Sequence, residues 1–135
     1  VQQRAAQREA HLQAAVEEAL TPAGKNRRYA FADLKGVQLA TPIYRELLAR
    51  GVACEPAAVQ MRVCLDQLAI GCHRYDRREK SGAYRAARDA ASLAAMELWL
   101  QSGGADEPLV DAIEQELLAA IAGLLRRSER GGGFD

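Results

Sequence analysis

The sequence predicts an all-α protein, folded as a single helical bundle of about five helices joined by short turns. The chain of 135 residues has the size of one domain and can bury its own core. Hydrophobic residues make up 49% of it and aromatic residues only 5%, while alanine is frequent and β-branched residues are few. This composition favours helices over strands. We expect one helical domain over residues 1–127 and a flexible, glycine-rich tail over residues 128–135.

In the N-terminal half, proline and glycine mark where helices should begin and end. Pro22 should end a first helix, whose apolar stripe is thin. Gly36 should end a short second helix, and Thr41 followed by Pro42 resembles an N-cap with proline at the first helical position. The helices expected here cover residues 3–20, 29–36 and 42–50, and Gly51 should stop the last of them.

After Gly51, a helix that restarts near Pro56 carries apolar residues at alternating spacings of three and four positions. This regularity is typical of a helix face that packs against neighbouring helices. The helix should break at Ser81 and Gly82. The expected seam comprises Met61, Leu65, Leu68, Cys72 and Tyr75.

A central helix should follow over residues 83–101, because nearly all of its side chains are apolar and many are alanine. Its alanines would let neighbouring helices approach closely, and Met96 and Trp99 would fill the wider gaps. Asp106 should cap a last helix that has Pro108 in its first turn. This helix should turn Val110, Ile113, Leu117, Ile121 and Leu124 inward.

Overall charge and cysteine content narrow the class of protein. The 18 basic and 18 acidic side chains cancel, so no global field attracts nucleic acid or a membrane surface. Charge is uneven locally, because residues 25–54 hold six basic and two acidic groups whereas residues 105–135 hold three and seven. No apolar run approaches the roughly 18 residues that span a bilayer. An odd number of cysteines, three, favours a reducing cytoplasm over an extracellular disulfide framework.

The stretch CLDQLAIGCHRYDRREK, residues 64–80, raises the question of a metal or catalytic site. Cys64 and Cys72 are separated by two helical turns, roughly 12 Å, which is too far for both to bind one zinc ion. Cys72 and His73 are adjacent and therefore point in different directions around a helix, which argues against a nucleophile paired with its base. We expect both thiols to be buried apolar side chains.

Two pairs of carboxylates have one-turn spacing, Asp76 with Glu79 and Asp111 with Glu114. Carboxylate metal sites in helical bundles also need matching partners on a facing helix, and the sequence offers none. Glycine-rich phosphate loops are absent as well. We therefore expect no catalytic residue, no metal ligand and no cofactor.

Two clusters of basic side chains, each beside a tyrosine, are the candidate binding residues. Arginine makes bidentate hydrogen bonds to phosphate, and tyrosine can stack on an unpaired base. The alternative is an ordinary solvated helix end. The first cluster comprises Lys25, Arg27 and Arg28 beside Tyr29; the second comprises Arg74, Arg77, Arg78 and Lys80 beside Tyr75, with Arg85 and Arg88 as extensions.

We expect a non-enzymatic subunit of a larger bacterial nucleoprotein assembly, whose arginines contact an RNA or DNA backbone and whose apolar stripes dock other subunits or a second copy. In size and helical character the chain resembles the small helical subunits of bacterial RNA-guided complexes, although no motif carries that comparison. One alternative is a dimeric DNA-binding regulator that uses residues 42–62. The stretch LLARGVACEPAAVQ, residues 47–60, resembles a helix-turn-helix with two extra residues in its turn. Another alternative is a helical interaction or dimerisation module without nucleic acid.

Overall fold

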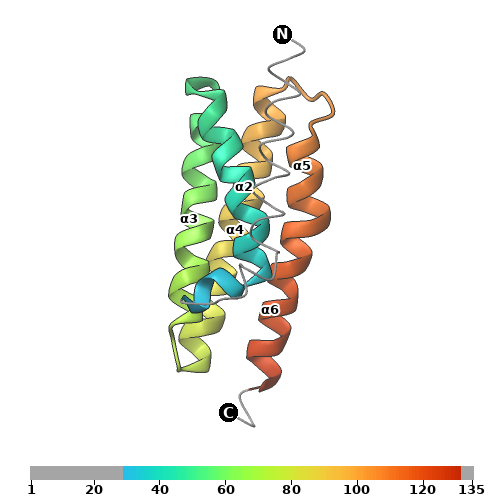
Figure 1. The fold of residues 1–135 in the computed structure, drawn as a ribbon. Coiled ribbons are helices and arrows are strands. Elements are labelled where there is room, and N and C mark those ends of the chain that lie inside the picture. The colour runs from blue at the N-terminus through green and yellow to red at the C-terminus, as the bar shows by residue number, and fades with distance from the viewer. Residues whose placement is uncertain (1–28, 132–135) are drawn as a thin grey trace.

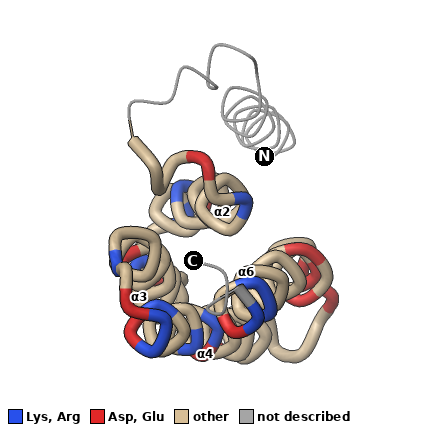
Figure 2. Tube along the Cα trace, turned by 90° about the horizontal axis from the view of Figure 1, so that it is seen from below, with Lys and Arg blue, Asp and Glu red and all other residues tan. Residues whose placement is uncertain are grey.

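Four helices stand side by side in residues 29–131, the part of the chain that the computed structural model describes (Figure 1). They run alternately up and down, and their order around the bundle follows the sequence (Figure 2). No strand occurs within this range, so the predicted all-α class is confirmed. The helix predicted over residues 3–20 lies outside the described residues. The elements are the 3₁₀ turns η2 (Ala30–Asp33) and η3 (Val52–Cys54), the helices α2 (Lys35–Arg50), α3 (Glu55–Cys72) and α4 (Arg77–Gln101), and a last helix made of α5 (Pro108–Ala112), the π-helical turn η4 (Ile113–Leu117) and α6 (Leu118–Gly131).

Helix α2 begins six residues before Thr41, at Lys35, and passes through both Gly36 and Pro42. The prediction that Gly36 ends one helix and Pro42 begins another is therefore wrong. Pro42 lacks an N–H group, but it is buried against the core, and this packing outweighs the local cost. Thr41 Oγ1 donates a hydrogen bond of 2.7 Å to the carbonyl one turn earlier. Gly51 ends α2 as predicted, with a positive φ of 84°.

The apolar seam of α3 faces the core only as far as the end of the helix at Cys72. Met61 and Leu68 are fully buried, as predicted, whereas Leu65 and Cys72 are half-buried. Tyr75 lies beyond the helix and is fully exposed, so its predicted place in the seam is wrong. The predicted seam residues therefore face the core within α3 but not in the turn that follows it.

The break between α3 and α4 falls before Asp76 and not at Ser81 and Gly82, where the sequence predicts it. Asp76 Oδ2 accepts a hydrogen bond of 3.1 Å from the backbone N of Glu79, which makes Asp76 the N-cap of α4. The helix then continues without interruption past Gly82. One glycine costs a helix about 1 kcal/mol, and the packing of this long helix offsets that cost.

Small side chains line the contact between α3 and α4. A Cβ atom at Gly71 would lie only 2.5 Å from the ring of Tyr84, so the buried tyrosine packs directly on the α3 backbone. Met96 and Trp99, predicted to fill wide gaps between helices, are instead about half exposed, and that prediction is wrong. The buried alanines of α4 are Ala83, Ala87, Ala90, Ala91, Ala94 and Ala95.

The last helix is capped by Glu107 and not by the predicted Asp106. The Glu107 carboxylate accepts a hydrogen bond of 3.2 Å from the backbone N of Leu109, and Pro108 is the first helical residue. Helix α6 continues to Gly131, so the predicted tail is helical over residues 128–131, and residues 132–135 lie outside the described part. The inward residues Ile113, Leu117, Ile121 and Leu124 are buried as predicted, and Val110 is half-buried.

Replacing Asp76 with alanine is expected to lower the free energy of unfolding by about 0.5–2 kcal/mol, because α4 loses its N-cap. Urea unfolding followed by circular dichroism measures the change. Asp89→Ala is the matched control, since Asp89 is an exposed aspartate in the middle of the same helix. Equal losses in the two variants would contradict the capping role of Asp76.

Candidate nucleic-acid interface

The lower end of the bundle in Figure 1 carries an excess of positive charge. Two segments form it, residues 73–85 at the α3–α4 turn and residues 126–130 near the end of α6, and we call it the basic end. These segments hold eight basic and three acidic side chains, so their formal charge is +5. Figure 2 looks at this end and shows basic residues of α4 and α6 side by side. The basic side chains are Arg74, Arg77, Arg78, Lys80, Arg85, Arg126, Arg127 and Arg130, and the acidic ones are Asp76, Glu79 and Glu129.

The position of Arg77 and Arg78 opposes the stability of α4. They are its first two residues, where the unpaired N–H groups carry partial positive charge. A cation at this position typically costs a helix about 0.3–1 kcal/mol, whereas the arginines near the C-terminus of α6 are favourably placed. The helix dipole therefore does not favour two arginines at the start of α4, although Arg77 also hydrogen-bonds the backbone carbonyl of Glu129 in α6.

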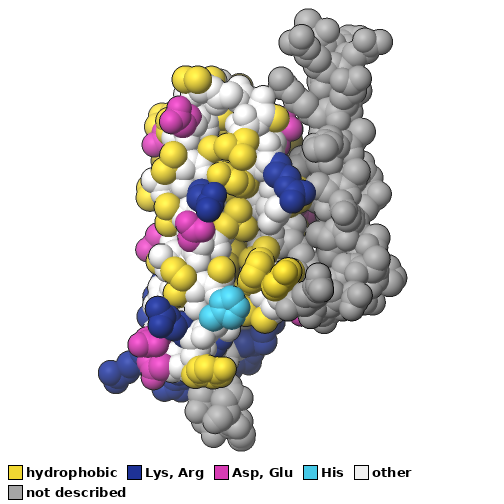
Figure 3. Space-filling view, turned by 60° about the vertical axis from the view of Figure 1, so that its left-hand side comes forward, with side chains coloured by type: hydrophobic (Ala, Val, Ile, Leu, Met, Phe, Trp, Pro, Cys, Tyr) yellow, Lys and Arg dark blue, Asp and Glu magenta, His cyan; other side chains and the backbone are white. Residues whose placement is uncertain are grey.

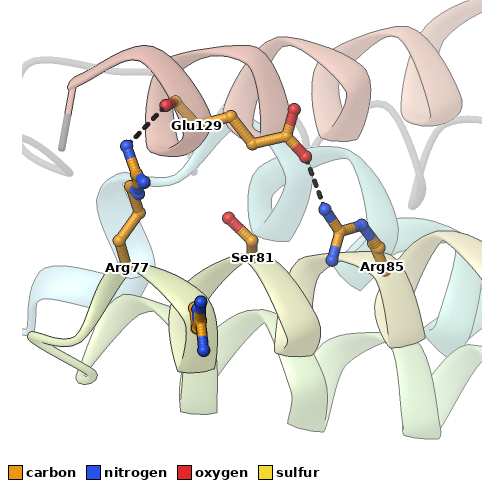
Figure 4. Close-up of a pocket in the computed structure, with 5 residues that line it drawn as sticks. Arg77, Ser81, Arg85 and Glu129 are labelled. Carbon is orange, nitrogen blue, oxygen red and sulfur yellow. Dashed lines mark hydrogen bonds and ion pairs between the residues drawn. The ribbon is translucent and has the colours of Figure 1, made fainter.

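An open pocket of about 440 Å³ lies between α4 and α6 at the basic end, lined by Arg77, Arg78, Ser81, Arg85 and Glu129. Arg77 donates a hydrogen bond of 3.1 Å to the backbone carbonyl of Glu129, and Arg85 donates one of 2.7 Å to its carboxylate. Figure 4 shows both arginines reaching from α4 toward Glu129, with Ser81 between them. Three arginines thus line a space large enough for a phosphate group.

A phosphate could displace the Glu129 carboxylate from Arg85 at little cost. Both side chains of this ion pair are about half exposed, and such pairs contribute only about 0–1 kcal/mol because water and salt screen them. Phosphate offers more acceptor oxygens and more charge than a carboxylate. The ion pair between Arg85 and Glu129 is therefore only a weak barrier to an anion in this pocket.

Not all of the predicted binding residues lie on this surface. Arg74, Arg77 and Arg78 are exposed there, whereas Lys80 is half-buried. The Lys80 ammonium donates hydrogen bonds of 2.8 and 3.4 Å to the last carbonyls of α3 and lies 5.7 Å from the centre of the Tyr84 ring. Lys80 therefore caps the C-terminus of α3. The predicted residues Lys25, Arg27 and Arg28 lie outside the described part of the chain.

Three further arginines of the basic end, Arg126, Arg127 and Arg130, were not among the predicted binding residues. The sequence suggests only a favourable helix C-terminus for Arg126 and Arg127, and it places Arg130 in the predicted flexible tail. They reach the predicted cluster because α6 runs antiparallel to α4 and ends where α4 begins. The signal that could have found them is topology, since alternating helices joined by short turns bring these two ends together.

Cys64 and the pair of Asp76 and Glu79 have structural roles. Burial raises the pKa of Cys64 to about 12, which keeps the thiol protonated and unreactive near neutral pH. The Asp76 carboxylate caps α4 by accepting a hydrogen bond from the backbone N of Glu79. Among residues 29–131, no three His, Cys, Asp or Glu side chains are grouped as metal ligands would be.

An apolar groove of about 580 Å³ lies between α2 and α3, away from the basic end. Figure 3 shows hydrophobic side chains gathered along this face. In the region of the possible helix-turn-helix, α2 and α3 lie side by side along their length (Figure 1), and α3 exposes Val59 and Val63 beside the charged side chain of Arg62. The groove is lined by Tyr44, Leu47, Leu48, Gly51, Val52, Glu55, Ala58, Val59, Arg62 and Val63.

Within the described part of the chain, no helix combines the length and apolar character that crossing a membrane requires. No protein-family model matches the sequence, and comparison with curated proteins and with solved structures finds no similar chain.

Proposed function

We propose that this chain is a non-enzymatic helical subunit that binds a nucleic-acid backbone through its basic end, within a larger nucleoprotein assembly. The observation that carries the proposal is the convergence of seven exposed arginines from two distant segments at one end of the bundle, where three of them line an open pocket. Guanidinium groups match the geometry of phosphate oxygens and remain charged at all relevant pH values. A surface of this kind holds a polyanion without reading its sequence.

Exposed apolar residues elsewhere support contacts with other protein subunits. Besides the groove between α2 and α3, the second half of α4 exposes four large apolar side chains. Met and Trp are enriched at protein interfaces relative to other surfaces. The unpaired cysteines also support a role in a reducing compartment such as the cytoplasm. The exposed residues of α4 are Leu93, Met96, Trp99 and Leu100.

Replacing both Arg77 and Arg78 with glutamate is expected to weaken binding of an oligonucleotide of about 20 nucleotides at least about tenfold, because phosphate contacts become repulsions. The slope of log K against log salt should fall by roughly one to two units, since about two phosphate contacts are lost. Fluorescence anisotropy between about 50 and 200 mM salt measures both quantities. The Arg27→Glu/Arg28→Glu variant applies the same test to the first predicted cluster.

The matched control is Arg45→Glu/Arg62→Glu, which makes the same change in charge away from the basic end, at exposed positions of α2 and α3. It should bind like the parent protein, and circular dichroism should show unchanged helix content in every variant. A general effect of net charge would weaken both double variants equally. Failure of the parent to bind any nucleic acid would leave the interaction or dimerisation module as the function.

A further inference from the structure

An array of aromatic rings lies beside the arginines of the basic end. The rings of Tyr29 and Phe31 are stacked, with centroids 5.8 Å apart and planes inclined by 15°. Phe31 in turn meets the edge of His73 at 6.1 Å, which joins the array to the α3–α4 turn. Figure 3 shows the histidine among hydrophobic side chains in the lower half of the bundle. The tertiary fold therefore brings the tyrosines of both predicted clusters to the same region.

Two tyrosine rings at the basic end, Tyr75 in the turn and Tyr29 in the array, are exposed to an extent that packing does not explain. Tyr75 is fully exposed within the turn and is flanked by Arg74 and, two residues later, by Arg77. Tyr29 is 59% exposed although it stacks on Phe31. Residues 29–131 hold six aromatic residues (Phe, Tyr and Trp), and four of them lie at this end: Tyr29, Phe31, Tyr75 and the buried Tyr84. Exposed rings interleaved with arginines are characteristic of surfaces that stack unpaired bases.

We infer that the ligand of the basic end is a single-stranded nucleic acid, whose bases stack on Tyr75 and Tyr29 while the arginines hold its phosphates. This inference rests on the proposed function. In a duplex the bases are paired and stacked on one another, so their faces cannot reach a tyrosine ring. The flank of α4 that carries Arg77 and Arg85 faces α6, where both side chains bond to Glu129, so this flank is not free to enter a major groove.

The test compares a fluorescein-labelled, unstructured single strand of about 20 nucleotides with a duplex of the same length, using the full chain. The parent should bind the single strand more tightly. Tyr75→Ala should weaken single-strand binding by about 5- to 150-fold and leave duplex binding unchanged, because stacking on one base is lost. Tyr75→Phe keeps the ring and should bind like the parent.

A direct readout places a tryptophan at the same position. In a Tyr75→Trp/Trp99→Phe variant, the only tryptophan stands in the α3–α4 turn, and base stacking should quench its fluorescence when single strand is added but not when duplex is added. If Tyr75→Ala binds as the parent does while Arg77→Glu/Arg78→Glu fails to bind, the single-strand inference is wrong and the proposed function stands. If the parent binds neither nucleic acid, both are wrong.

Discussion

Replacing Leu68 with alanine is expected to lower the free energy of unfolding by about 2–5 kcal/mol. Leu68 is fully buried, and its methyl groups cover the backbone of Gly36 in α2, where a Cβ atom would lie 3.3 Å from Leu68 Cδ1 and 3.8 Å from Ile121 in α6. Three helices therefore meet at this side chain. Its removal would leave a cavity that their rigid backbones cannot close, and urea unfolding measures the loss.

The control is Ile70→Ala, because Ile70 is an aliphatic residue of the same helix that is 39% exposed. Its truncation should cost less than about 1.5 kcal/mol, since only part of the side chain is removed from contact with protein. An equally large loss from Ile70→Ala would show that the contact of the three helices at Leu68 does not dominate the stability of α3.

The burial of Leu68 could be predicted from sequence because it depends on local periodicity alone. Met61 and Leu68 repeat on one face of α3, and a helix with that pattern must bury that face. The end of the helix depends on a different signal. In the sequence, Asp76 and Glu79 have the spacing of a possible metal-binding pair. In the structure, the Asp76 carboxylate accepts a hydrogen bond from the backbone N of Glu79 and so caps the start of α4. Recognising this cap would have ended the seam before Tyr75.

Tertiary packing overrode the local signals at Pro42 and Gly82. Proline would break an isolated helix and glycine would weaken one, but in this fold Pro42 is buried in the core and Gly82 lies within the first turns of a 25-residue helix. The close approach of Gly71 to Tyr84 was also beyond prediction, because it joins two helices whose relative register the sequence does not state. Periodicity predicts which face of a helix is buried, and it does not predict which residue of the neighbour that face meets.

The candidate binding site could also be predicted only where it depends on residues that are close in the sequence. The cluster at Arg77 and Arg78 is contiguous in the sequence and could be predicted, whereas its pocket depends on Glu129 of α6, 52 residues away from Arg77. Lys80 is contiguous with the cluster too, but its ammonium group points into the end of α3. Charge density in the sequence locates such a surface and does not tell which cations cap a helix and which face the solvent.

Glu107→Ala is expected to lower the free energy of unfolding by about 2–4 kcal/mol near neutral pH, because one carboxylate has two roles. It caps the last helix through the backbone N of Leu109, and it forms two hydrogen bonds, of 3.0 and 3.2 Å, with the guanidinium of Arg50 at the end of α2. The pair is mostly buried, so the variant leaves Arg50 with fewer acceptors than its burial requires. Asp106→Ala is the matched control. The sequence pointed to Asp106 as the cap, but the structure leaves it exposed, and its loss should cost less than about 0.5 kcal/mol.

The Glu107 carboxylate should also make the free energy of unfolding depend on pH in the acidic range. Burial alone would raise the pKa of Glu107, but the hydrogen bonds from Arg50 and Leu109 outweigh it and lower the pKa below its ordinary value of 4.5. A carboxyl group whose pKa is lower in the folded than in the unfolded state stabilises the fold above the unfolded pKa, and this contribution is lost as the pH falls through the folded pKa. The parent should therefore lose stability below about pH 4.5, and Glu107→Ala should lose less over the same range. Parallel acid profiles for the two proteins would mean that the pairing of Arg50 with Glu107 does not persist in solution.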